Sequence, residues 1–291
     1  MSNSGRKKQK QITQLSKKYI RSKIKSFLLE DAPGRDITTE LFINRKDIKK
    51  YAIKGKEKMV VCGTKIIKYC FSKKCKIKIN HLDGTHITNG STIGTIEGPF
   101  QDIVYGERVM LNLLQRMGGI ATLTNRLVNN RKNKAVKLLD TRKTTPGLRL
   151  FEKYAVIVGG GQNHRTDLSS AILVKENHIH SIKSLEEAVL QARKKHPEKI
   201  IEIEIDSLKL AKKVATLNID TILVDNMSPV KAQSAIEKIK EINKNIYIEV
   251  SGGINEENYQ EYMQTGTDAI SMGCLTHSAK NVDISLVLNK T

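Results

Sequence analysis

The stretch Ile200–Asn226, "IIEIEIDSLKLAKKVATLNIDTILVDN", decides the fold. It opens with apolar residues alternating with glutamate (200–206). A segment with helical spacing of apolar residues follows (207–217), and a second strand-like segment, "DTILVDN" (220–226), ends the stretch. Strand, helix and strand within about 20–25 residues are typical of a βα unit, whose strands lie parallel in one sheet. The stretch therefore predicts an α/β fold.

The same period continues on both sides of this stretch. Further strands are predicted at 135–140, 170–177, 246–253 and 267–273, and further helices at 184–195, 228–242 and 255–266. Ser207, Ser228 and Asn255 precede helices and are suitable N-cap residues. We expect an incomplete or closed α/β barrel, with an open doubly wound sheet as the alternative.

The N-terminal part follows a different pattern. Residues 1–18 are predicted to be a disordered basic tail. Residues 19–120 are predicted to form an α+β sandwich domain with helices at 19–31 and 102–118 and strands at 58–63 and 75–80. Residues 121–275 are assigned to the barrel, and the C-terminal segment 276–291 is expected to join the sandwich domain.

Composition excludes several classes of protein. Hydrophobic residues make up 39% of the 291 residues, which is typical of a folded chain. No apolar run reaches the roughly 18 residues that cross a bilayer, and the basic N-terminus lacks the apolar block of a signal peptide. The four cysteines form no C-x-x-C pair, so we predict reduced thiols rather than a zinc site. We therefore expect a cytoplasmic protein with no membrane partner.

The net charge of +20 is concentrated near the N-terminus. Residues 1–80 hold 23 Lys and Arg against 6 Asp and Glu, a net of +17, and the remaining residues carry +3. A solvated basic face, an electrostatic lure for an anionic small molecule and an RNA-binding surface all fit this charge. RNA recognition usually adds arginine and stacking aromatics, but the chain has 38 Lys to 12 Arg and 4% aromatic residues. We therefore predict no nucleic-acid partner.

The "IEIEI" run indicates which side chains face the barrel interior. Ile201, Ile203 and Ile205 alternate with Glu202 and Glu204, and in a barrel the outward face of a strand packs on helices. The isoleucines are then outside and the glutamates inside, where a buried carboxylate needs a cation or a polar ligand. An edge strand with solvent-facing glutamates is the alternative.

Polar residues or glycines follow the predicted strands at six carboxyl ends, which is where barrel enzymes place their chemistry. They are Asp140, Thr141, Arg142 and Lys143; Lys175, Glu176, Asn177 and His178; Glu204 and Asp206; Asp225 and Asn226; Ser251, Gly252 and Gly253; and Met272, Gly273 and Cys274.

The cations in and near this set favour an anionic substrate. Arg142, Lys143 and Lys175 lie at strand ends, and His164 and Arg165 follow the glycines of "GGGQNHRTD" (159–167). Arginine binds a carboxylate through two parallel hydrogen bonds, and Asp140 is expected to orient the cations beside it.

Two further features indicate a phosphate and a metal. "SGGI" (251–254) after a strand, opening a helix at Asn255, favours a phosphate held by backbone N–H groups. Glu204 and Asp225 beside such a site suggest Mg²⁺ or ribose hydroxyls.

The chain resembles the quinolinate phosphoribosyltransferases, also called carboxylating nicotinate-nucleotide pyrophosphorylases. The resemblance covers residues 28–287 and rests on "EDAPGRDITTELF", "GERVMLNLLQRMGGIAT", "DTRKTTPGLRLFEKYAVIVGGGQNHRTDLSSAILVKENHI", "EIEIDSL", "ILVDNMSP", "EVSGGI" and "ISMGCLTHSAKNVDISL". It implies that quinolinate and phosphoribosyl pyrophosphate react, with Mg²⁺, to nicotinate mononucleotide, pyrophosphate and CO₂ in NAD biosynthesis. It also implies a homodimer with shared active sites, or a higher oligomer.

The resemblance assigns roles to the candidate residues. The set that would hold the quinolinate carboxylates is Arg108, Arg142, His164, Arg165 and Lys175, with Thr141 beside them. Lys143, Glu204 and Asp225 would serve the phosphoribosyl group, catalysis and the metal. Backbone contacts to phosphate would come from Ser251, Gly252, Gly253, Met272, Gly273 and Cys274.

A nicotinate phosphoribosyltransferase of the same barrel type, which does not decarboxylate, is the nearest alternative. A site for two carboxylates needs more cations than a site for one. Arg108, Arg142, Arg165 and Lys175 together favour two.

Overall fold

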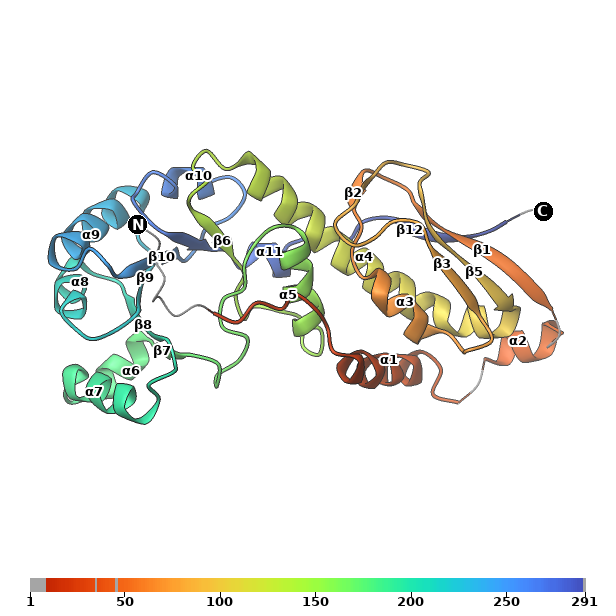
Figure 1. The fold of residues 1–291 in the computed structure, drawn as a ribbon, viewed down its shortest axis with the longest axis horizontal. Coiled ribbons are helices and arrows are strands. Elements are labelled where there is room, and N and C mark those ends of the chain that lie inside the picture. Colours follow the sequence, from red (N-terminus) through yellow and green to blue (C-terminus); the bar gives the residue numbers. More distant parts are fainter. Residues whose placement is uncertain (1–8, 35, 45–46, 290–291) are drawn as a thin grey trace. The chain divides into compact units, whose positions relative to one another are not determined.

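The computed structural model describes residues 9–34, 36–44 and 47–289 and divides the chain into two units (Figure 1). The barrel unit consists of Leu127–Thr144 and Gly161–His277, with the described residues before Ile12. The sandwich unit consists of Ile12–Arg126, Thr145–Gly160 and the residues from Ser278 onward.

The barrel unit alternates strands and helices. Its strands are β6 (Lys137–Leu139), β7 (Ile172–Val174), β8 (Ile201–Ile205), β9 (Thr221–Asp225), β10 (Tyr247–Ser251) and β11 (Ala269–Ser271). Its helices are α6 (Glu176–Ser181), α7 (Leu185–Lys195), α8 (Leu208–Ala215), α9 (Pro229–Ile242), α10 (Tyr259–Tyr262) and α11 (Cys274–His277).

The six strands form one parallel sheet in the order β6-β11-β10-β9-β8-β7. From β7 to β11 the strands lie side by side in the order in which the chain makes them, and β6, the first strand of the unit, pairs with β11, the last. This arrangement is that of a barrel, whereas the strand order of a doubly wound sheet reverses direction at a switch point. Among the described residues β6 and β7 do not pair, so the barrel is incomplete. The predicted fold class is confirmed, in its incomplete form.

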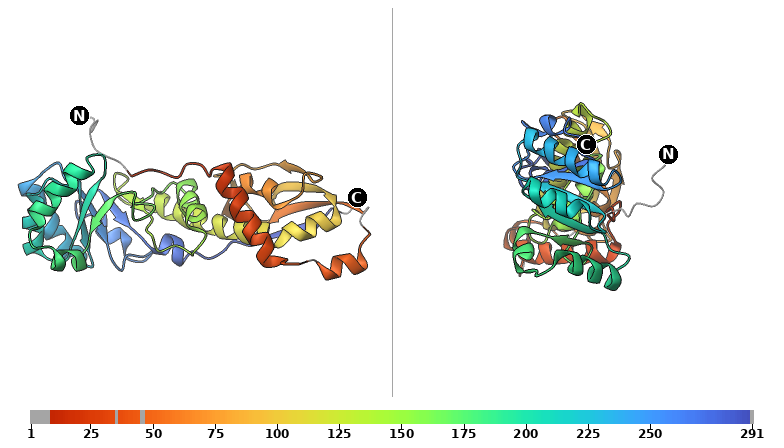
Figure 2. Two further views of the ribbon diagram at one scale, coloured as in Figure 1. Left: turned by 90° about the horizontal axis from the view of Figure 1, so that it is seen from below. Right: turned by 90° about the vertical axis from the view of Figure 1, so that its left-hand side faces the viewer.

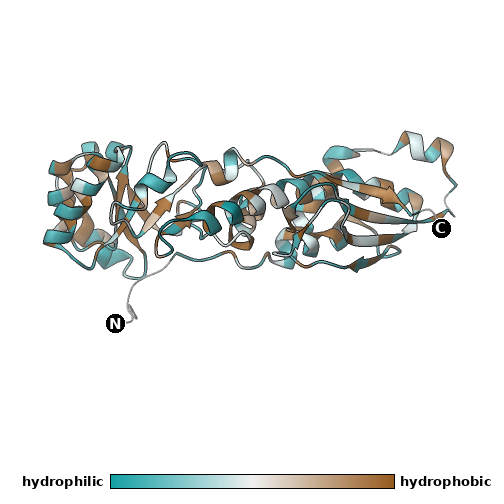
Figure 3. Cartoon of the chain, turned by 90° about the horizontal axis from the view of Figure 1, so that it is seen from above, coloured by the Kyte–Doolittle hydropathy of each residue, from teal (hydrophilic) through white to brown (hydrophobic). Residues whose placement is uncertain are grey.

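The strand register separates an outer face from an inner face. Ile203 pairs with Ile222, which pairs with Ile248, and all three side chains are fully buried. Helices α8 and α9 cover this outer face with small and branched residues such as Val214 and Ile236. The views in Figures 2 and 3 show the barrel-unit helices outside the strands, with hydrophobic colour on the strands and hydrophilic colour on the outer helix faces.

The sandwich unit is built on the antiparallel sheet β12-β1-β5-β3. Its strands are β1 (Ile48–Gly55), β2 (Met59–Val60), β3 (Lys76–Ile79), β4 (His86–Ile87), β5 (Thr92–Pro99) and β12 (Ile284–Leu288), and β2 pairs with β4 separately. Its helices are α1 (Lys17–Asp31), α2 (Ile37–Phe42), α3 (Thr64–Cys70), α5 (Arg149–Val158) and most of α4 (Phe100–Asn130). β12, from the C-terminal segment, pairs with β1.

The described part of the N-terminal segment is more ordered than expected. Residues 1–8 of the predicted tail lie outside the described residues. The Gln11 side chain donates to the Asn163 carbonyl (3.2 Å) and accepts from the Asn163 N–H (2.7 Å). The Ser16 hydroxyl accepts from the Tyr19 N–H and caps α1, so the helix begins at Lys17. The expected disorder is therefore corrected for residues 9–18.

The boundary between the units differs from the expected one at residue 120. Helix α4 belongs to the sandwich unit as far as Arg126, and so does the insert Thr145–Gly160 between β6 and β7. Fully buried Glu152 of this insert accepts from the Arg116 Nε of α4 at 2.9 Å, which joins the insert to the helix. A Cβ on Gly119 would lie 2.0 Å from the Lys280 carbonyl, so glycine lets the C-terminal segment approach α4.

No helix among the described residues is both long enough and apolar enough to cross a membrane.

Candidate active site

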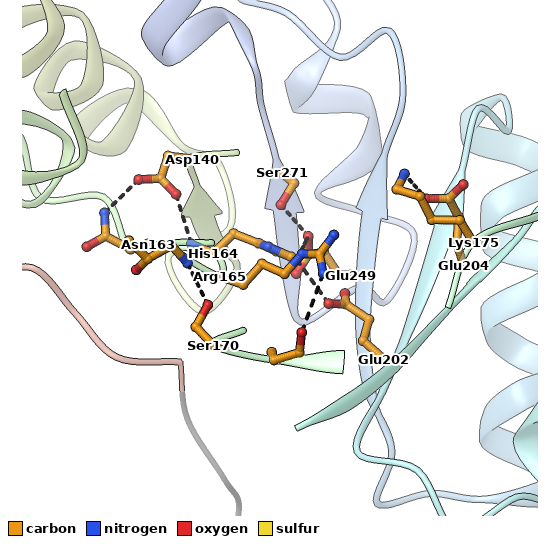
Figure 4. A network of polar contacts seen from close by, with 12 residues as sticks. Asp140, Asn163, His164, Arg165, Ser170, Lys175, Glu202, Glu204, Glu249 and Ser271 are labelled. Carbon is orange, nitrogen blue, oxygen red and sulfur yellow. Dashed lines mark hydrogen bonds and ion pairs between the residues drawn. The ribbon is translucent and has the colours of Figure 1, made fainter. Parts of the chain in front are cut away.

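The inner face of the sheet brings polar side chains together at the carboxyl ends of β7 to β10. Lys175 follows β7, Glu204 lies near the end of β8, and Asp225 ends β9 in register with Ser251 of β10. The Lys175 Nζ lies 2.7 Å from the Glu204 Oε2 (Figure 4). The structure therefore gathers four residues that the sequence predicted at strand ends.

Asp225 lies in a partly desolvated cluster of charges. Burial raises the pKa of its carboxyl, and the Glu204 charge acts in the same direction, whereas the charges of Lys175 and Lys143 lower it. Glu204, Asp225 and Asn226 line a cavity of about 180 Å³ at this end of the barrel unit. The two acids thus line one hollow, and the charges of the two lysines act on Asp225.

The open side of the barrel holds the second group of cations. Residue 162 forms a parallel bridge with Leu139 of β6 and places His164 and Arg165 beside the gap between β6 and β7. Buried Asp140 fixes this segment, because its carboxylate accepts from the His164 N–H (2.9 Å) and from the Asn163 Nδ2 (2.6 Å). Asp140 was expected to orient the cations beside it; these bonds give it a role in placing His164.

Two arginines at this position lie close enough to repel each other. Arg165 is 6% exposed, and burial followed by the Arg142 charge lowers its pKa, while Glu202, Asp167 and Glu204 raise it. Arginine nevertheless keeps its charge in proteins. The Arg142 Nε is buried and has no hydrogen-bond partner among the described residues. Repelling guanidinium groups and a partnerless donor are what an anionic ligand would satisfy.

The loop after β10 differs in part from the expectation. Gly252 (φ +92°) and Gly253 (φ +63°) have left-handed backbones, and a Cβ on Gly252 would lie 2.3 Å from the Asn226 Oδ1. The expected helix start at Asn255 is wrong: the Asn255 Oδ1 accepts from the N–H of residues 257 and 258 and forms a turn, and α10 begins at Tyr259. A phosphate at this position would therefore contact backbone N–H groups of the glycine turn and not the N-terminus of a helix.

The loop after β11 lies beside Lys143. The Thr276 hydroxyl donates to the Lys143 carbonyl at 2.7 Å, and a Cβ on Gly273 would lie 3.0 Å from both the Lys143 and His277 side chains. His277, four residues after Gly273, is thus a site neighbour that the sequence analysis missed. Burial raises the pKa of the Cys274 thiol to about 11, so a thiolate role is excluded near neutral pH.

The remaining predicted residues are Thr141, Met272 and Arg108. The Thr141 hydroxyl accepts from the Lys143 N–H (3.0 Å), and the Met272 N–H donates to the Leu139 carbonyl (2.9 Å). Arg108 is an exposed side chain on α4 in the sandwich unit, where it lines a cavity of about 370 Å³ with Glu30 and Asp31 among others. Its contribution to the site stays a prediction.

A buried polar network on the inner face was found only in part from the sequence. The His164 Nε2 lies 3.0 Å from the Glu202 Oε2 and 3.4 Å from the Glu249 Oε1, and the Ser271 hydroxyl donates to the same Oε1 (Figure 4). Glu249 and Ser271 were missed. The signal for Glu249 was present, because Ile248, Glu249 and Val250 repeat the alternation of the "IEIEI" run.

Two sets of side chains have the chemistry of metal ligands. Glu204 and Asp225 provide carboxylates next to the expected phosphate site, which suits Mg²⁺ because this ion is usually bound by one or two carboxylates and by substrate phosphates. His164, Glu202 and Glu249 have ligand atoms within 4.8 Å of one another.

The comparisons with known proteins agree with this geometry. The model of the family "Quinolinate phosphoribosyl transferase, C-terminal domain" matches residues 120–287, and that of the corresponding N-terminal domain matches residues 36–118. A protein of Methanocaldococcus jannaschii named "Probable nicotinate-nucleotide pyrophosphorylase (carboxylating)" is 40% identical over 280 residues, covering 93% of this chain and 97% of the relative. A Methanothermobacter thermautotrophicus protein of the same name is 37% identical, over 90% of this chain and 96% of its own.

A solved structure described as the nicotinate-nucleotide pyrophosphorylase from Francisella tularensis superimposes with a TM-score of 0.90 at 32% identity. It covers 97% of this chain and 100% of the other. The predicted resemblance is confirmed by three findings: family models match both parts of the chain, relatives match over nearly their full length, and a solved structure has the same fold. The chain belongs to the quinolinate phosphoribosyltransferase family.

Proposed function

We propose that this chain transfers the phosphoribosyl group of phosphoribosyl pyrophosphate to quinolinate with decarboxylation, and so forms nicotinate mononucleotide, pyrophosphate and CO₂ in NAD biosynthesis. The observation that carries the proposal is the Arg142–Arg165 pair, whose like charges lie close together and whose Arg142 Nε has no hydrogen-bond partner in the described part of the chain. The relatives named as carboxylating nicotinate-nucleotide pyrophosphorylases support it.

Quinolinate would be held through its two carboxylates. Arg142, His164, Arg165 and Lys175 supply cationic or hydrogen-bonding groups from the open side of the barrel and the end of β7, and Arg108 is proposed to complete the set. A guanidinium pairs with a carboxylate through two hydrogen bonds, which fixes the ring as well as binding it. The side chains of four residues carry a positive charge and together suit a dianion better than the single carboxylate of nicotinate: Arg108, Arg142, Arg165 and Lys175.

Phosphoribosyl pyrophosphate would lie against the loops after β10 and β11. The glycine turn at Ser251–Gly253 and the N–H groups of Gly273 and Cys274 would contact the phosphate, and Lys143 beside Gly273 would offer a charge to the pyrophosphate. The Met272 N–H already donates to the Leu139 carbonyl, so Met272 would contribute through its position in the loop rather than as a donor. Positive charge develops on the ribose as the pyrophosphate leaves, and Glu204 or Asp225 would stabilise it from the inner face.

Loss of the 2-carboxylate would follow ribosylation of the ring nitrogen, because the positively charged ring then accepts the electron pair of the breaking C–C bond. Binding of that carboxylate away from water favours the step. The C2 carbanion that remains after CO₂ leaves takes up one proton, which solvent water can supply, and displacement of pyrophosphate by the ring nitrogen needs no proton transfer. We therefore assign no side chain as general acid or base.

Mg²⁺ is proposed as the cofactor, and Glu204 and Asp225 are proposed to hold it. The fit rests on the two carboxylates and on the burial and neighbouring Glu204 charge that raise the pKa of Asp225, both of which a cation would offset. When bound, the ion would neutralise charge on the leaving pyrophosphate.

A homodimer with shared sites, or a higher oligomer built from it, completes the proposal. It is supported by the exposure of Arg108 and by that of Ile37 (63%), Leu41 (72%) and Phe42 (78%) on α2, an apolar surface that association would bury. We also propose a cytoplasmic location, which suits four cysteines that are all free thiols.

The test is a turnover assay with phosphoribosyl pyrophosphate, Mg²⁺ and either quinolinate or nicotinate. Quinolinate labelled with ¹⁴C in the 2-carboxylate should release labelled CO₂ in a 1:1 ratio with nicotinate mononucleotide, and nicotinate should give little or no product. Equal turnover of both acids would refute the choice of substrate, and mononucleotide without CO₂ would refute the decarboxylation.

A further inference from the structure

Two buried glutamates beside His164 have no role in the reaction proposed above. Glu202 and Glu249 are 1% and 2% exposed, and neither was assigned to a substrate or to the metal. A buried carboxylate is costly unless hydrogen bonds or opposite charges compensate it. Their position beside a predicted substrate-binding histidine indicates where that compensation lies.

The contacts form a short chain that ends at the imidazole ring. The Ser271 hydroxyl donates to the Glu249 Oε1, and this oxygen lies 3.4 Å from the His164 Nε2. The Glu202 Oε2 lies 3.0 Å from the same nitrogen. Figure 4 shows Glu202 of β8 and Glu249 of β10 beside the His164 ring, and Ser271 of β11 reaching Glu249. Acids from two strands therefore lie beside the ring of His164, which is itself on a loop segment, and a third strand supplies the hydroxyl that bonds one of them.

The surroundings of Glu249 allow it to accept hydrogen bonds without a full charge. Burial raises the pKa of the Glu249 carboxyl to about 7, the His164 charge opposes the rise, and the charges of Glu202 and Asp140 add to it. The charge of Arg165, the residue after His164, interacts favourably with that of Glu202. With a proton on its Oε2, Glu249 would keep Oε1 as the acceptor for Ser271, and this oxygen lies 3.4 Å from the ring nitrogen.

We propose that Glu249, held by Ser271, is a positioning residue that together with Glu202 fixes the His164 ring for binding the quinolinate carboxylates. The inference rests on the proposed function, because it assumes that His164 contacts quinolinate. It does not require Glu249 to touch either substrate. Loss of the outer partner of a metal-binding histidine typically costs about 10–100-fold in affinity or activity, and we expect the lower end of that range for a histidine that binds a carboxylate.

The test compares two replacements that differ in one property. Glu249→Gln keeps an Oε1 acceptor, and Glu249→Leu has similar size without one. We expect Glu249→Leu and Ser271→Ala to weaken quinolinate binding in calorimetric titrations, the former by about tenfold. Glu249→Gln should stay within about threefold, and phosphoribosyl pyrophosphate affinity should change less than twofold in all three. The exposed Glu237→Gln, on α9, is the matched control and should bind both ligands like wild type.

A double-mutant cycle decides whether Glu249 acts through His164. If it does, Glu249→Leu should cost nothing further in a His164→Ala background. An additive loss, or an equal loss of affinity for both ligands with a lowered Tm, would overturn the positioning role in favour of a general structural one. Wild-type protein that fails to bind quinolinate would instead refute the proposed function.

Metal analysis of the purified protein tests the other reading of the cluster. His164, Glu202 and Glu249 could together ligate a transition metal. We expect no stoichiometric zinc or manganese after dialysis in wild type. One bound ion per chain that disappears in Glu249→Leu would overturn the positioning role.

Discussion

Replacing Glu249 by glutamine should stabilise the protein increasingly as the pH rises from 5 to 8. Glu249 is 2% exposed, and burial is the main cause that raises its pKa from the ordinary 4.5 to about 7. Glutamine has nearly the same volume and can keep the hydrogen bond that the Ser271 hydroxyl donates. The change thus removes an ionisable group without opening a cavity.

The sign follows from the direction of the shift. A carboxyl with a raised folded-state pKa binds its proton more tightly in the folded state, so its contribution to stability is complete below pH about 4.5 and is lost as the pH rises through about 7. A shift of two to three pH units corresponds to on the order of 3 kcal/mol. For a unit of this size that is roughly 5–10 °C in Tm.

Scanning calorimetry of wild type and Glu249→Gln at pH 5, 6, 7 and 8 and constant ionic strength measures the effect. Comparing the two proteins at each pH cancels the other titrating groups. The exposed Glu237→Gln should track wild type at every pH. A Tm difference that stays constant, or that turns against the variant as the pH rises, would refute the reasoning, because Glu249 would then be fully ionised and held by His164.

Three further predictions concern the reaction. Glu204→Gln should lower kcat by about 100-fold or more with an unchanged Tm, since it removes a charge beside the reacting ribose; near-wild-type rates would exclude that role. Arg142→Lys keeps the charge but loses the planar fork, so the quinolinate Kd should rise while the phosphoribosyl pyrophosphate Kd stays nearly constant, and equal losses would place Arg142 in the phosphate site. Arg108→Ala and Glu204→Ala should each be nearly inactive alone. When they are co-expressed in equal amounts, about a quarter of wild-type activity should return under two-fold symmetry; a doubly tagged mixed dimer without activity would show that sites are not shared.

The fold could be predicted because its signal repeats along the chain. Each βα unit carries the same change from strand to helix, and Ser207 and Ser228 do precede α8 and α9. The sequence was less informative where the start or the presence of an element depends on one short segment. Asn255 has the chemistry of an N-cap, but its side chain closes a turn instead, and only four residues of the expected helix become α10. Strand β1 was missed because lysines fill its first exposed positions.

The site could be predicted where a residue follows a strand and not where it lies deeper on one. Lys175, Glu204 and Asp225 are near strand ends, and a strand end can be read from the pattern. Glu249 lies two residues before the end of β10. Ser271 is an exception, because it ends β11, but that strand has only three residues and all three are buried, so Ser271 does not stand out from the core around it. Their importance depends on the register between strands, because the register brings segments together that are distant in the sequence. The residue pattern of a single strand does not contain this information.

The strand repeat also explains why acids lie behind an anion site. Side chains two residues apart on a strand share a face about 6.6 Å apart, so Glu202 lies behind Glu204 on β8 and Glu249 lies behind Ser251 on β10. The deeper acids lie beside the His164 ring nitrogen, and the charge of Glu202 also acts favourably on the buried Arg165. Two full negative charges there would weaken binding of a dianion. Burial raises the pKa of Glu249 to about 7, which favours its protonated form below neutral pH and so reduces the negative charge behind the anion site.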